Sequence, residues 1–409
     1  MPAAYEPVLG GLETTAHALA RHLTAQGHET QVLTNRYPRS LNARETIDGI
    51  SVHRNMFLQP TLAHLQNRRP DLWLASLYYC PATLSYARRL LSAFRPEVVN
   101  VHFPDAQIPF VLRMKRDRTF RLIVSLHGHE ILRWFETIDC HCDERPNSVA
   151  PGNRARQQLG TVLKEADAVT ACSKYLLDKA IELEPEVTAK GHVIHNGIDP
   201  ERFVDKMAFA HSRRYLLAFG RLVYQKGFDL LLRAFALVAS DHPDVDLVIA
   251  GDGEQGLNLQ MEAEELKLAA RVFFTGRASP VEVVKLLNGC LFVVVSSRWE
   301  PYGITALEAL AGGKPVLATR VGGLPEFLGD GANPETRVRT MLVEPTVEGL
   351  SEGLRRWLEL RREIEFRQEP DRAWLSCHAW AAVAGRYLEV YGQTGRPLQG
   401  RTPAFPPNR

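Results

Sequence analysis

The hydrophobic positions of the chain follow two patterns, short runs of consecutive apolar residues and longer stretches with one apolar helical face. Runs such as DLVIAG and LFVVVSS are typical of strands buried on both faces, which belong to parallel sheets covered by helices. The predicted strands are 29–34, 50–54, 98–103, 121–127, 168–173 and 192–195 in the first half of the chain, and 215–219, 245–250, 271–275, 291–296, 315–318 and 340–343 in the second half.

Helical patterns lie between these strands. Apolar residues recur at helical spacing in residues 12–26, 228–239, 303–311 and 348–358. Alternation of strands and helices indicates βαβ units, so we predict an α/β chain with doubly wound parallel sheets. The alternating strands and helices form two series of similar length, one in each half of the chain. They predict two Rossmann-like domains, with a boundary in the turn-rich segment 196–213.

This boundary gives a predicted partition of the chain. Residues 1–198 are assigned to an N-terminal domain and residues 199–375 to a C-terminal domain. Residues 376–392 are assigned to a last helix. Residues 393–409 carry four prolines and few apolar side chains, and we expect them to form a disordered tail.

The N-terminus departs from the pattern of a doubly wound domain, whose first strand lies near the middle of the sheet. Gly10 and Gly11 open a predicted helix, but the nine residues before them contain two prolines and no β-rich run. Either the central strand is built unusually or the natural start lies upstream of Met1, and we favour the second explanation.

Composition and charge exclude several classes of protein. The 409 residues carry 49 basic and 47 acidic side chains, which gives a net charge of +2. A chain so close to neutral has no overall positive electrostatic field that would attract nucleic acid. Six cysteines do not make a disulfide scaffold and fit a reducing cytoplasm. No apolar run approaches the roughly 18 residues of a membrane span, and the N-terminus lacks a signal-peptide pattern. We therefore expect a cytoplasmic protein.

Two local features leave alternatives open. Residues 68–95 and 113–121 mix basic and apolar or aromatic side chains, which suits either a peripheral contact with anionic lipid at the inner membrane surface, an anionic acceptor, or a solvated helix face. The sequence Cys140-His141-Cys142 contains residue types that bind zinc in proteins. Structural zinc needs four ligands and no second cluster lies near in the sequence, so we expect no metal site.

The segment SSRWEPYGITALEALAGGKPVLAT places two carboxylates near a helix start. Glu300 follows the carboxyl end of a predicted strand, where ligands of open α/β sheets bind. Glu308 lies about one turn inside the next helix, and its side chain leans back toward the start of that helix. The backbone N–H groups at this start belong to Gly303, Ile304 and Thr305. This arrangement suits a phosphate beside sugar hydroxyls, although two glutamates can also serve only to complement the helix dipole.

Three further motifs follow predicted strands or open a helix. Gly220, Arg221 and Lys226 follow the first strand of the second half, where the two cations suit a diphosphate or form a solvated pair. Gly10-Gly11 allows close approach of a phosphate, or is a plain turn. His127, in LHGHE, suits a sugar hydroxyl or acid–base chemistry, or is a loop histidine.

In their order and spacing, these motifs resemble the retaining glycosyltransferases of family 4, the group 1 transferases with the GT-B fold. The resemblance covers residues 5–392, and its most specific part is the Glu-x7-Glu pair of Glu300 and Glu308. Other matching segments are GRLVYQKG, AGDGE, VFFTG, GGLE, LHGHE and HNGIDPERF. The resemblance implies two Rossmann-like domains that face a central cleft.

The resemblance implies which residues hold the donor, a nucleotide-sugar. Arg221 and Lys226, in the motif that begins at Gly220, hold its diphosphate. Glu308 accepts hydrogen bonds from the ribose, and the base stacks near Gly276. No metal or other cofactor is implied, because the two cations and the helix start supply positive charge.

The resemblance also implies which residues act on the sugar. Glu300 contacts the transferred sugar together with the amides of residues 303–305, and His127 binds the sugar or the reacting region. Gly11, next to Gly10, lets the N-terminal domain close on the phosphates. The anomeric configuration is retained, and the departing phosphate helps to deprotonate the acceptor hydroxyl.

The chain departs from the family pattern at both ends. The missing first strand puts the geometry of Gly10 and Gly11 in doubt. The C-terminal segment lacks the usual Ser-Trp pair, although Trp380 lies close to that place. In the family this last helix crosses back to the first domain, so we expect Trp380 to pack at that interface.

Three functions are compatible with this sequence. The first is a glycosyltransferase that makes an α-glycosidic bond to a glycan, lipid or small-molecule acceptor held by the N-terminal domain. The second is a sugar-nucleotide epimerase of the same fold, which would convert its donor without an acceptor. The third is an inactive nucleotide- or glycan-binding subunit, against which the intact set of site residues argues.

Overall fold

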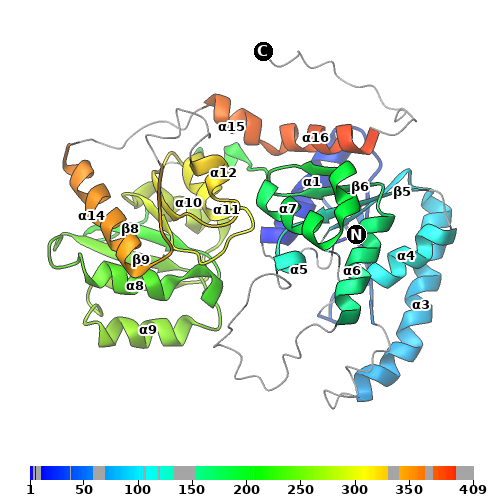
Figure 1. The fold of residues 1–409 in the computed structure, drawn as a ribbon, viewed down its shortest axis with the longest axis horizontal. Coiled ribbons are helices and arrows are strands. Elements are labelled where there is room, and N and C mark those ends of the chain that lie inside the picture. Colours follow the sequence, from blue (N-terminus) through cyan, green and yellow to red (C-terminus); the bar gives the residue numbers. More distant parts are fainter. Residues whose placement is uncertain are drawn as a thin grey trace.

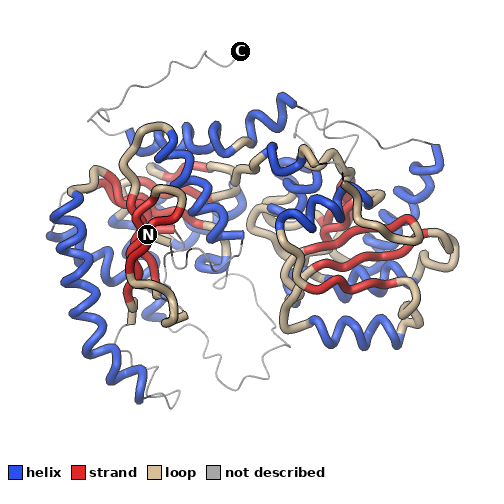
Figure 2. The backbone as a smooth tube through the Cα atoms, turned by 180° about the vertical axis from the view of Figure 1, so that it is seen from behind, coloured by secondary structure: helices blue, strands red, loops and turns tan. Residues whose placement is uncertain are grey.

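The computed structural model describes the chain except for residues 3–4, 6–10, 37, 59–69, 103, 105–106, 118–119, 133–152, 206, 330–339, 364–371 and 393–409. Two α/β units lie side by side, one from each half of the chain (Figure 1). Seen from behind, strands occupy the centre of each unit and helices lie around them (Figure 2). The predicted α/β architecture is confirmed.

The second half contains a six-stranded parallel sheet with the order β10-β9-β8-β11-β12-β13. Its strands are β8 (Arg214–Phe219), β9 (Val245–Ala250), β10 (Val272–Gly276), β11 (Val293–Val295), β12 (Val316–Thr319) and β13 (Thr340–Val343). Counted from β8, this is the 3-2-1-4-5-6 order of a doubly wound sheet. The order reverses between β8 and β11, so the ligand crevice is expected beyond the carboxyl ends of these two strands.

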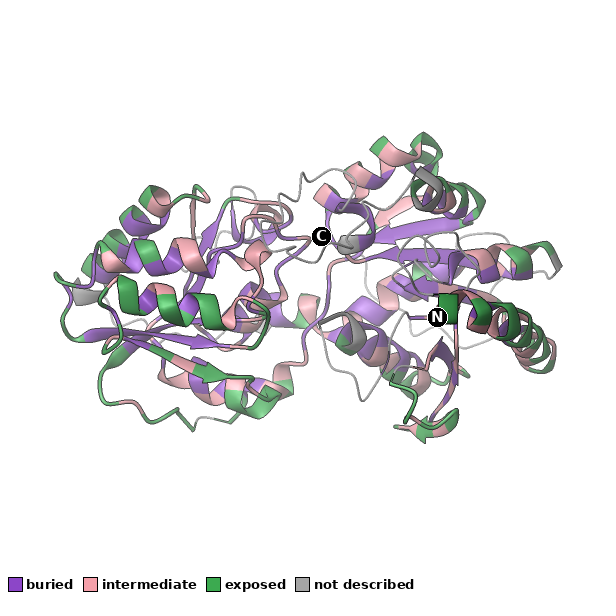
Figure 3. Cartoon of the chain, turned by 90° about the horizontal axis from the view of Figure 1, so that it is seen from below, coloured by how far each residue is buried: buried purple, intermediate pink, exposed green. Residues whose placement is uncertain are grey.

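Helices cover both faces of this sheet. They are α8 (Phe228–Ala236), α9 (Gly256–Glu265), α10 (Pro280–Gly289), α11 (Ile304–Ala311), α12 (Pro325–Leu328) and α14 (Val347–Glu363). In β8, Leu216 and Ala218 pack into a cluster with α8, α9 and α14, whereas Leu217 and Phe219 pack into another with α10 and α11. Buried residues gather on the strands and exposed ones on the outer helix faces (Figure 3). The consecutive apolar runs in the sequence arise from this double coverage.

The strands of the first half form two separate sheets. In one, β1 (Gln31–Asn35) pairs in parallel with β3 (Ile50–Asn55), and β2 (Arg44–Ile47) runs antiparallel to β3. The other is parallel, with the order β4 (Val98–His102), β5 (Arg121–Leu126), β6 (Ala168–Ala171) and β7 (Gly191–Val193). Strand β2 was not predicted, although the Asp48-Gly49 turn that follows it is a hairpin signal.

Helices of the first half surround these sheets. They are α1 (Gly11–Ala25), α3 (Pro70–Phe94), α4 (Ile108–Asp117), α5 (His129–Leu132), α6 (Asn153–Glu165) and α7 (Lys174–Leu183), with 3-10 turns at Pro185–Ala189 and Pro200–Phe203. The basic and aromatic stretch 68–95 lies largely in α3, on which Leu74 and Tyr78 are exposed. In the described part of the chain, no helix combines the length and the apolar content needed to cross a bilayer.

The last two helices, α15 (Arg372–His378) and α16 (Trp380–Gly392), link the units along one side (Figure 1). Trp380 and Tyr387 of α16 are buried in a cluster with Leu19 of α1. The backbone pairs with the connecting segment as well, since Trp380 N donates to Ile198 O over 3.1 Å. The expectation that Trp380 packs where the last helix returns to the first half is confirmed.

The approach of Trp380 to Gly197 yields a stability prediction. A Cβ at Gly197 would lie 2.6 Å from the indole ring, so Gly197→Ala should lower the free energy of unfolding by about 1–3 kcal/mol through overpacking. Gly385→Ala in α16 meets no atom within 4 Å and should be neutral or stabilising by up to about 1 kcal/mol. Denaturant unfolding measures both values. Equal effects of the two substitutions would contradict the packing described here.

Candidate functional site

A close backbone contact lies beyond the carboxyl ends of β8 and β11, where the ligand crevice is expected. After Gly220 the chain makes a 3-10 turn, η3 (Tyr224–Lys226), which ends at Gly227. Gly227 has a φ of 61°, and a Cβ there would lie 2.1 Å from the carbonyl oxygen of Ser296. Only glycine permits this approach, which places Lys226 beside the loop that follows β11.

Lys226 and Glu300 form an ion pair in this loop. Lys226 Nζ lies 2.5 Å from Glu300 Oε2, and Ser297 Oγ donates to the same oxygen over 3.1 Å. The side chain of Glu300 is 8% exposed and that of Lys226 is 17% exposed, so water screens the pair weakly. The structure therefore brings a cation and a carboxylate from two motifs to one point beyond the ends of β8 and β11.

The start of α11 adds backbone donors at the same place. Gly303 precedes the helix with a φ of 106°, and the first N–H groups of an α-helix have no partner within the helix. These groups belong to Gly303, Ile304 and Thr305. Thr305 Oγ1 lies 3.4 Å from the carbonyl oxygen of Phe219, so the helix start is adjacent to the end of β8. Arg221, two residues beyond Phe219, is exposed, and no residue in the described ranges forms an ion pair with it.

Glu308 lies one turn inside α11, and its partner was not predicted. Arg202 Nη2 lies 3.3 Å from Glu308 Oε1, and Arg202 belongs to the 3-10 turn that connects the two halves. Burial raises the pKa of the Glu308 carboxyl, whereas the Arg202 guanidinium lowers it. The segment HNGIDPERF, a predicted turn and one of the segments that match the family, thus also supplies a cation to the site.

His127 lies at the carboxyl end of β5, in a loop that a buried carboxylate holds. Glu130 accepts hydrogen bonds from the backbone N–H groups of His127 and Gly128. His127 Nε2 lies 3.1 Å from His102 Nδ1, and the two rings stack with their centroids 5.3 Å apart. Burial lowers the pKa of His127 to about 4, so its imidazole is neutral at pH 7 and suited to hydrogen bonding.

The two halves of the chain meet next to Glu300. A Cβ at Gly128 would lie 2.3 Å from Cγ of Pro301, so the loop after β5 packs directly on the residue that follows Glu300. His127 directly precedes Gly128 in the sequence, and Glu300 directly precedes Pro301, so both residues are next to this contact. Residues of both halves therefore meet beside Glu300.

Glu326 forms a second junction between the halves, and it was not predicted. Its carboxylate, on α12, accepts hydrogen bonds of 2.8 Å from the backbone N–H groups of Lys174 and Tyr175 at the start of α7. His195 Nε2 lies 3.3 Å from the same carboxylate. Burial acts to raise the pKa of Glu326, but the hydrogen bonds from His195 and the two amides hold the pKa below its usual value. An ionised carboxylate of one half thus caps a helix of the other.

The loop before Glu326 also touches the backbone of Glu300. Gly323 N donates to Glu300 O over 2.9 Å. Gly322 has a φ of 54°, and a Cβ there would lie 1.9 Å from the same oxygen. The pair Gly322-Gly323 ahead of Glu326 is the sequence signal that could have pointed to this junction.

Of the remaining predicted site residues, Gly11 and Gly276 form no hydrogen bond with Lys226 or Glu300 in the described part of the chain. Gly11 is the first residue of α1, and Gly10 lies outside the described residues. Gly276 is the last residue of β10 and has a φ of 72°. Because β10, β9 and β8 run in parallel, Gly276 lies on the side of the sheet where the carboxyl ends of these strands meet. Residues 140–142 lie outside the described part, and within the described part no group of three His, Cys, Asp or Glu side chains is arranged to hold a metal.

Comparison with protein families matches both halves of the chain. The family described as Glycosyltransferase Family 4 matches residues 9–202, and the family described as Glycosyl transferases group 1 matches residues 199–373. An uncharacterized glycosyltransferase of Methanocaldococcus jannaschii is 29% identical over 79% of this chain and 80% of its own. A glycogen synthase of Mycobacterium tuberculosis is 26% identical over 98% of this chain and 96% of its own.

Solved structures with the same fold span nearly the whole chain. Sucrose-phosphate synthase from Thermosynechococcus elongatus superimposes with a TM-score of 0.74 at 18% identity, covering 96% of this chain and 95% of its own. Anabaena HepE in complex with UDP-glucose superimposes with a TM-score of 0.68 at 18% identity, covering 95% of this chain and 97% of its own. These neighbours establish the GT-B fold.

The Glu326 junction predicts a change in shape. Glu326→Gln removes the charge that caps α7 across the two halves, so the halves should separate more often and the radius of gyration measured by X-ray scattering should increase. Glu282→Gln is the matched control, because Glu282 caps α10 within one half. Both substitutions should cost about 1 kcal/mol of stability. An unchanged radius of gyration in the Glu326 variant would show that the junction does not hold the halves together.

The stacked histidines predict how stability depends on pH. Burial keeps the pKa of His127 near 4 and that of His102 well below its usual 6.5, so near pH 5 the unfolded chain binds more protons than the folded one. The free energy of unfolding should therefore decrease as pH falls from 7 toward 4. His127→Asn should make this decrease shallower, because it removes one of the two buried imidazoles. Denaturant unfolding at several pH values tests this, and a steeper or unchanged slope in the His127 variant would contradict it.

Proposed function

The chain belongs to the group 1 glycosyltransferases of family 4, which transfer sugars from nucleotide-sugars, and we propose that it retains the anomeric configuration of the donor and makes an α-glycosidic bond. The observation that carries this proposal is the Lys226–Glu300 pair beside the start of α11. The Lys226 ammonium, the Glu300 carboxylate and the start of α11 lie at the switch point of a doubly wound sheet, where such sheets bind nucleotides.

The diphosphate of the donor would lie between β8 and α11. Lys226, the exposed Arg221 and the N–H groups of residues 303–305 present positive charge to the phosphate oxygens. These groups stabilise the negative charge that develops on the leaving nucleoside diphosphate as the sugar departs. We propose that they do so without a metal or other cofactor.

The nucleoside would extend along the carboxyl edge of the sheet from this point. Glu308, one turn inside α11, accepts hydrogen bonds from the ribose hydroxyls, and Arg202 keeps its carboxylate oriented. The base would lie toward Gly276 at the end of β10. Anabaena HepE, a neighbour of the same fold, was solved with UDP-glucose, which supports a nucleotide-sugar of this kind as donor.

The sugar would lie at the junction of the two halves, between Glu300 and His127. In the transfer, the bond from the anomeric carbon to the phosphate oxygen breaks and a bond from the acceptor oxygen to the same carbon forms on the same face. The acceptor hydroxyl gives its proton to the departing phosphate oxygen. Neutral His127 positions a sugar hydroxyl by hydrogen bonding, and residues 1–198 hold the acceptor, a glycan, lipid or small molecule.

Donor binding and turnover test this proposal together. A thermal-shift screen with UDP-, GDP- and ADP-sugars should identify one donor that raises the Tm of the wild-type protein. Lys226→Ala and Glu308→Ala should fold, as judged by circular dichroism, but lose turnover by at least about 100-fold, which corresponds to roughly 2.7 kcal/mol. Lys164→Ala, at an exposed site in α6, is the control and should keep wild-type activity.

The outcomes separate the proposal from its alternatives. A product with the α-configuration by NMR supports retention, and a product with inverted configuration contradicts it. Conversion of the donor without any acceptor would indicate an epimerase instead. Wild-type turnover in both Lys226→Ala and Glu308→Ala would refute the site assignment.

A further inference from the structure

A second histidine lies against His127 on the side of the first half. His127 follows β5 and is half-buried, whereas His102 is the last residue of β4 and is 5% exposed. His127 Nε2 lies 3.1 Å from His102 Nδ1, which is a hydrogen-bond distance, and the two ring planes differ by 19°. What His127 can offer to a sugar therefore depends on which of these two nitrogens carries the proton.

One proton lies between the two rings. Burial lowers the pKa of both, that of His127 to about 4 and that of His102 well below its usual 6.5, so both rings are neutral at pH 7. A neutral imidazole has one N–H group and one nitrogen lone pair. One ring therefore donates and the other accepts, and the direction of this hydrogen bond sets the tautomer of both rings.

The two directions differ in the tautomers that they require. If His127 Nε2 donates to His102 Nδ1, both rings carry their proton on Nε2, and in the opposite direction both carry it on Nδ1. Neutral histidine in water favours the Nε2 form, and a hydrogen bond at one nitrogen decides the role of the other. No described residue forms a hydrogen bond with His127 Nδ1 or His102 Nε2, so the intrinsic preference decides in favour of donation by His127.

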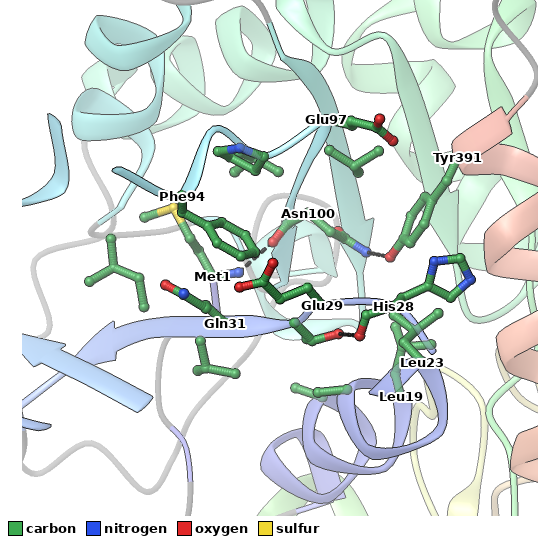
Figure 4. A pocket seen from close by; sticks show the side chains of 18 of the residues that line it. Met1, Leu19, Leu23, His28, Glu29, Gln31, Phe94, Glu97, Asn100 and Tyr391 are labelled. Carbon is green, nitrogen blue, oxygen red and sulfur yellow. Dashed lines mark hydrogen bonds between the residues drawn. The ribbon is translucent and has the colours of Figure 1, made fainter. Parts of the chain in front are cut away.

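The ring of His102 is held in place from behind. Asn100 lies two residues earlier on β4, on the same face as His102, and Ser125 Oγ donates to Asn100 Oδ1 over 2.9 Å. Asn100 and Tyr391 of α16 line a cavity of about 510 Å³, where Asn100 Nδ2 donates to Tyr391 Oη over 2.7 Å (Figure 4). The ring of Tyr387, also on α16, lies beside His102 with the centroids 6.4 Å apart. These contacts fix β4 and α16 around His102.

We propose that His102 is a positioning residue for the transfer reaction, which accepts the hydrogen bond of His127 Nε2–H and so leaves the lone pair of His127 Nδ1 for the sugar. His127 is then an acceptor for a sugar hydroxyl and not a donor. This inference rests on the proposed function, in which the sugar lies beside His127. It adds the direction of that hydrogen bond and a role for a residue that does not touch the substrate.

Three substitutions at one position test the role of His102. His102→Leu removes the acceptor and should lower kcat by about 10-fold, the value of one hydrogen bond. The donor KM should change by less than about twofold, because the contacts to the diphosphate and the ribose remain. His102→Asn should restore most of kcat, because its amide oxygen lies near the place of Nδ1. His102→Gln is the matched control and should stay slow, because its amide lies nearer to the place of Nε2.

Equal kcat values in the Asn and Gln variants, or a wild-type kcat in His102→Leu, would overturn the inference. A double substitution separates positioning from a general loss of structure. When His127 is already replaced in His127→Leu, adding His102→Leu should lower kcat by less than about twofold, because no ring is left to orient. Losses that multiply in the double variant would overturn the inference as well.

The nitrogen resonances of the histidine rings give a readout that does not need turnover. In protein labelled with ¹⁵N-histidine, an N–H nitrogen and a lone-pair nitrogen resonate at different shifts, and His127→Asn identifies the signals of His127. Wild-type His127 should carry its proton on Nε2, and His102→Leu should convert this form into a mixture of both tautomers. A proton on Nδ1 of wild-type His127 would overturn the inference. The expected tautomer in a protein that transfers no sugar would instead refute the proposed function.

Discussion

The candidate site depends on backbone segments that lie closer together than side chains permit. Gly227 lies against the carbonyl of Ser296 and Gly322 against the carbonyl of Glu300, both with positive φ. These two contacts bring three loops of the second half together around Glu300. Because any Cβ would force the loops apart, the ion pair between Lys226 and Glu300 is a consequence of glycine placement as much as of charge.

The same cluster of loops connects the site to the other half of the chain. Pro301 packs on Gly128, beside His127, and the loop that carries Glu326 reaches the start of α7. At the far end, α16 returns to pack on α1. A transferase that must hold donor and acceptor in one geometry needs its two halves aligned, and these contacts align them beside Glu300.

Much of the fold was predictable because its signals are local. Runs such as that of β9 are apolar at every position since helices cover both faces, and a strand end followed by a helix start marks the switch point. Arg202 and Glu326 were not predictable in this way, because each meets its partner only through the tertiary arrangement of the halves. Strand β2 was missed because its alternation is short and its residues are largely polar, although its turn carried a signal.

The position of the diphosphate tests the central claim most directly. A crystal structure with a nucleoside diphosphate should place the terminal phosphate at the start of α11, with oxygens within hydrogen-bond distance of the amides of residues 303–305 and of Lys226 Nζ. Glu308 should then face the ribose. A nucleotide bound away from the ends of β8 and β11, or one that leaves Lys226 and the start of α11 without contact, would contradict the account.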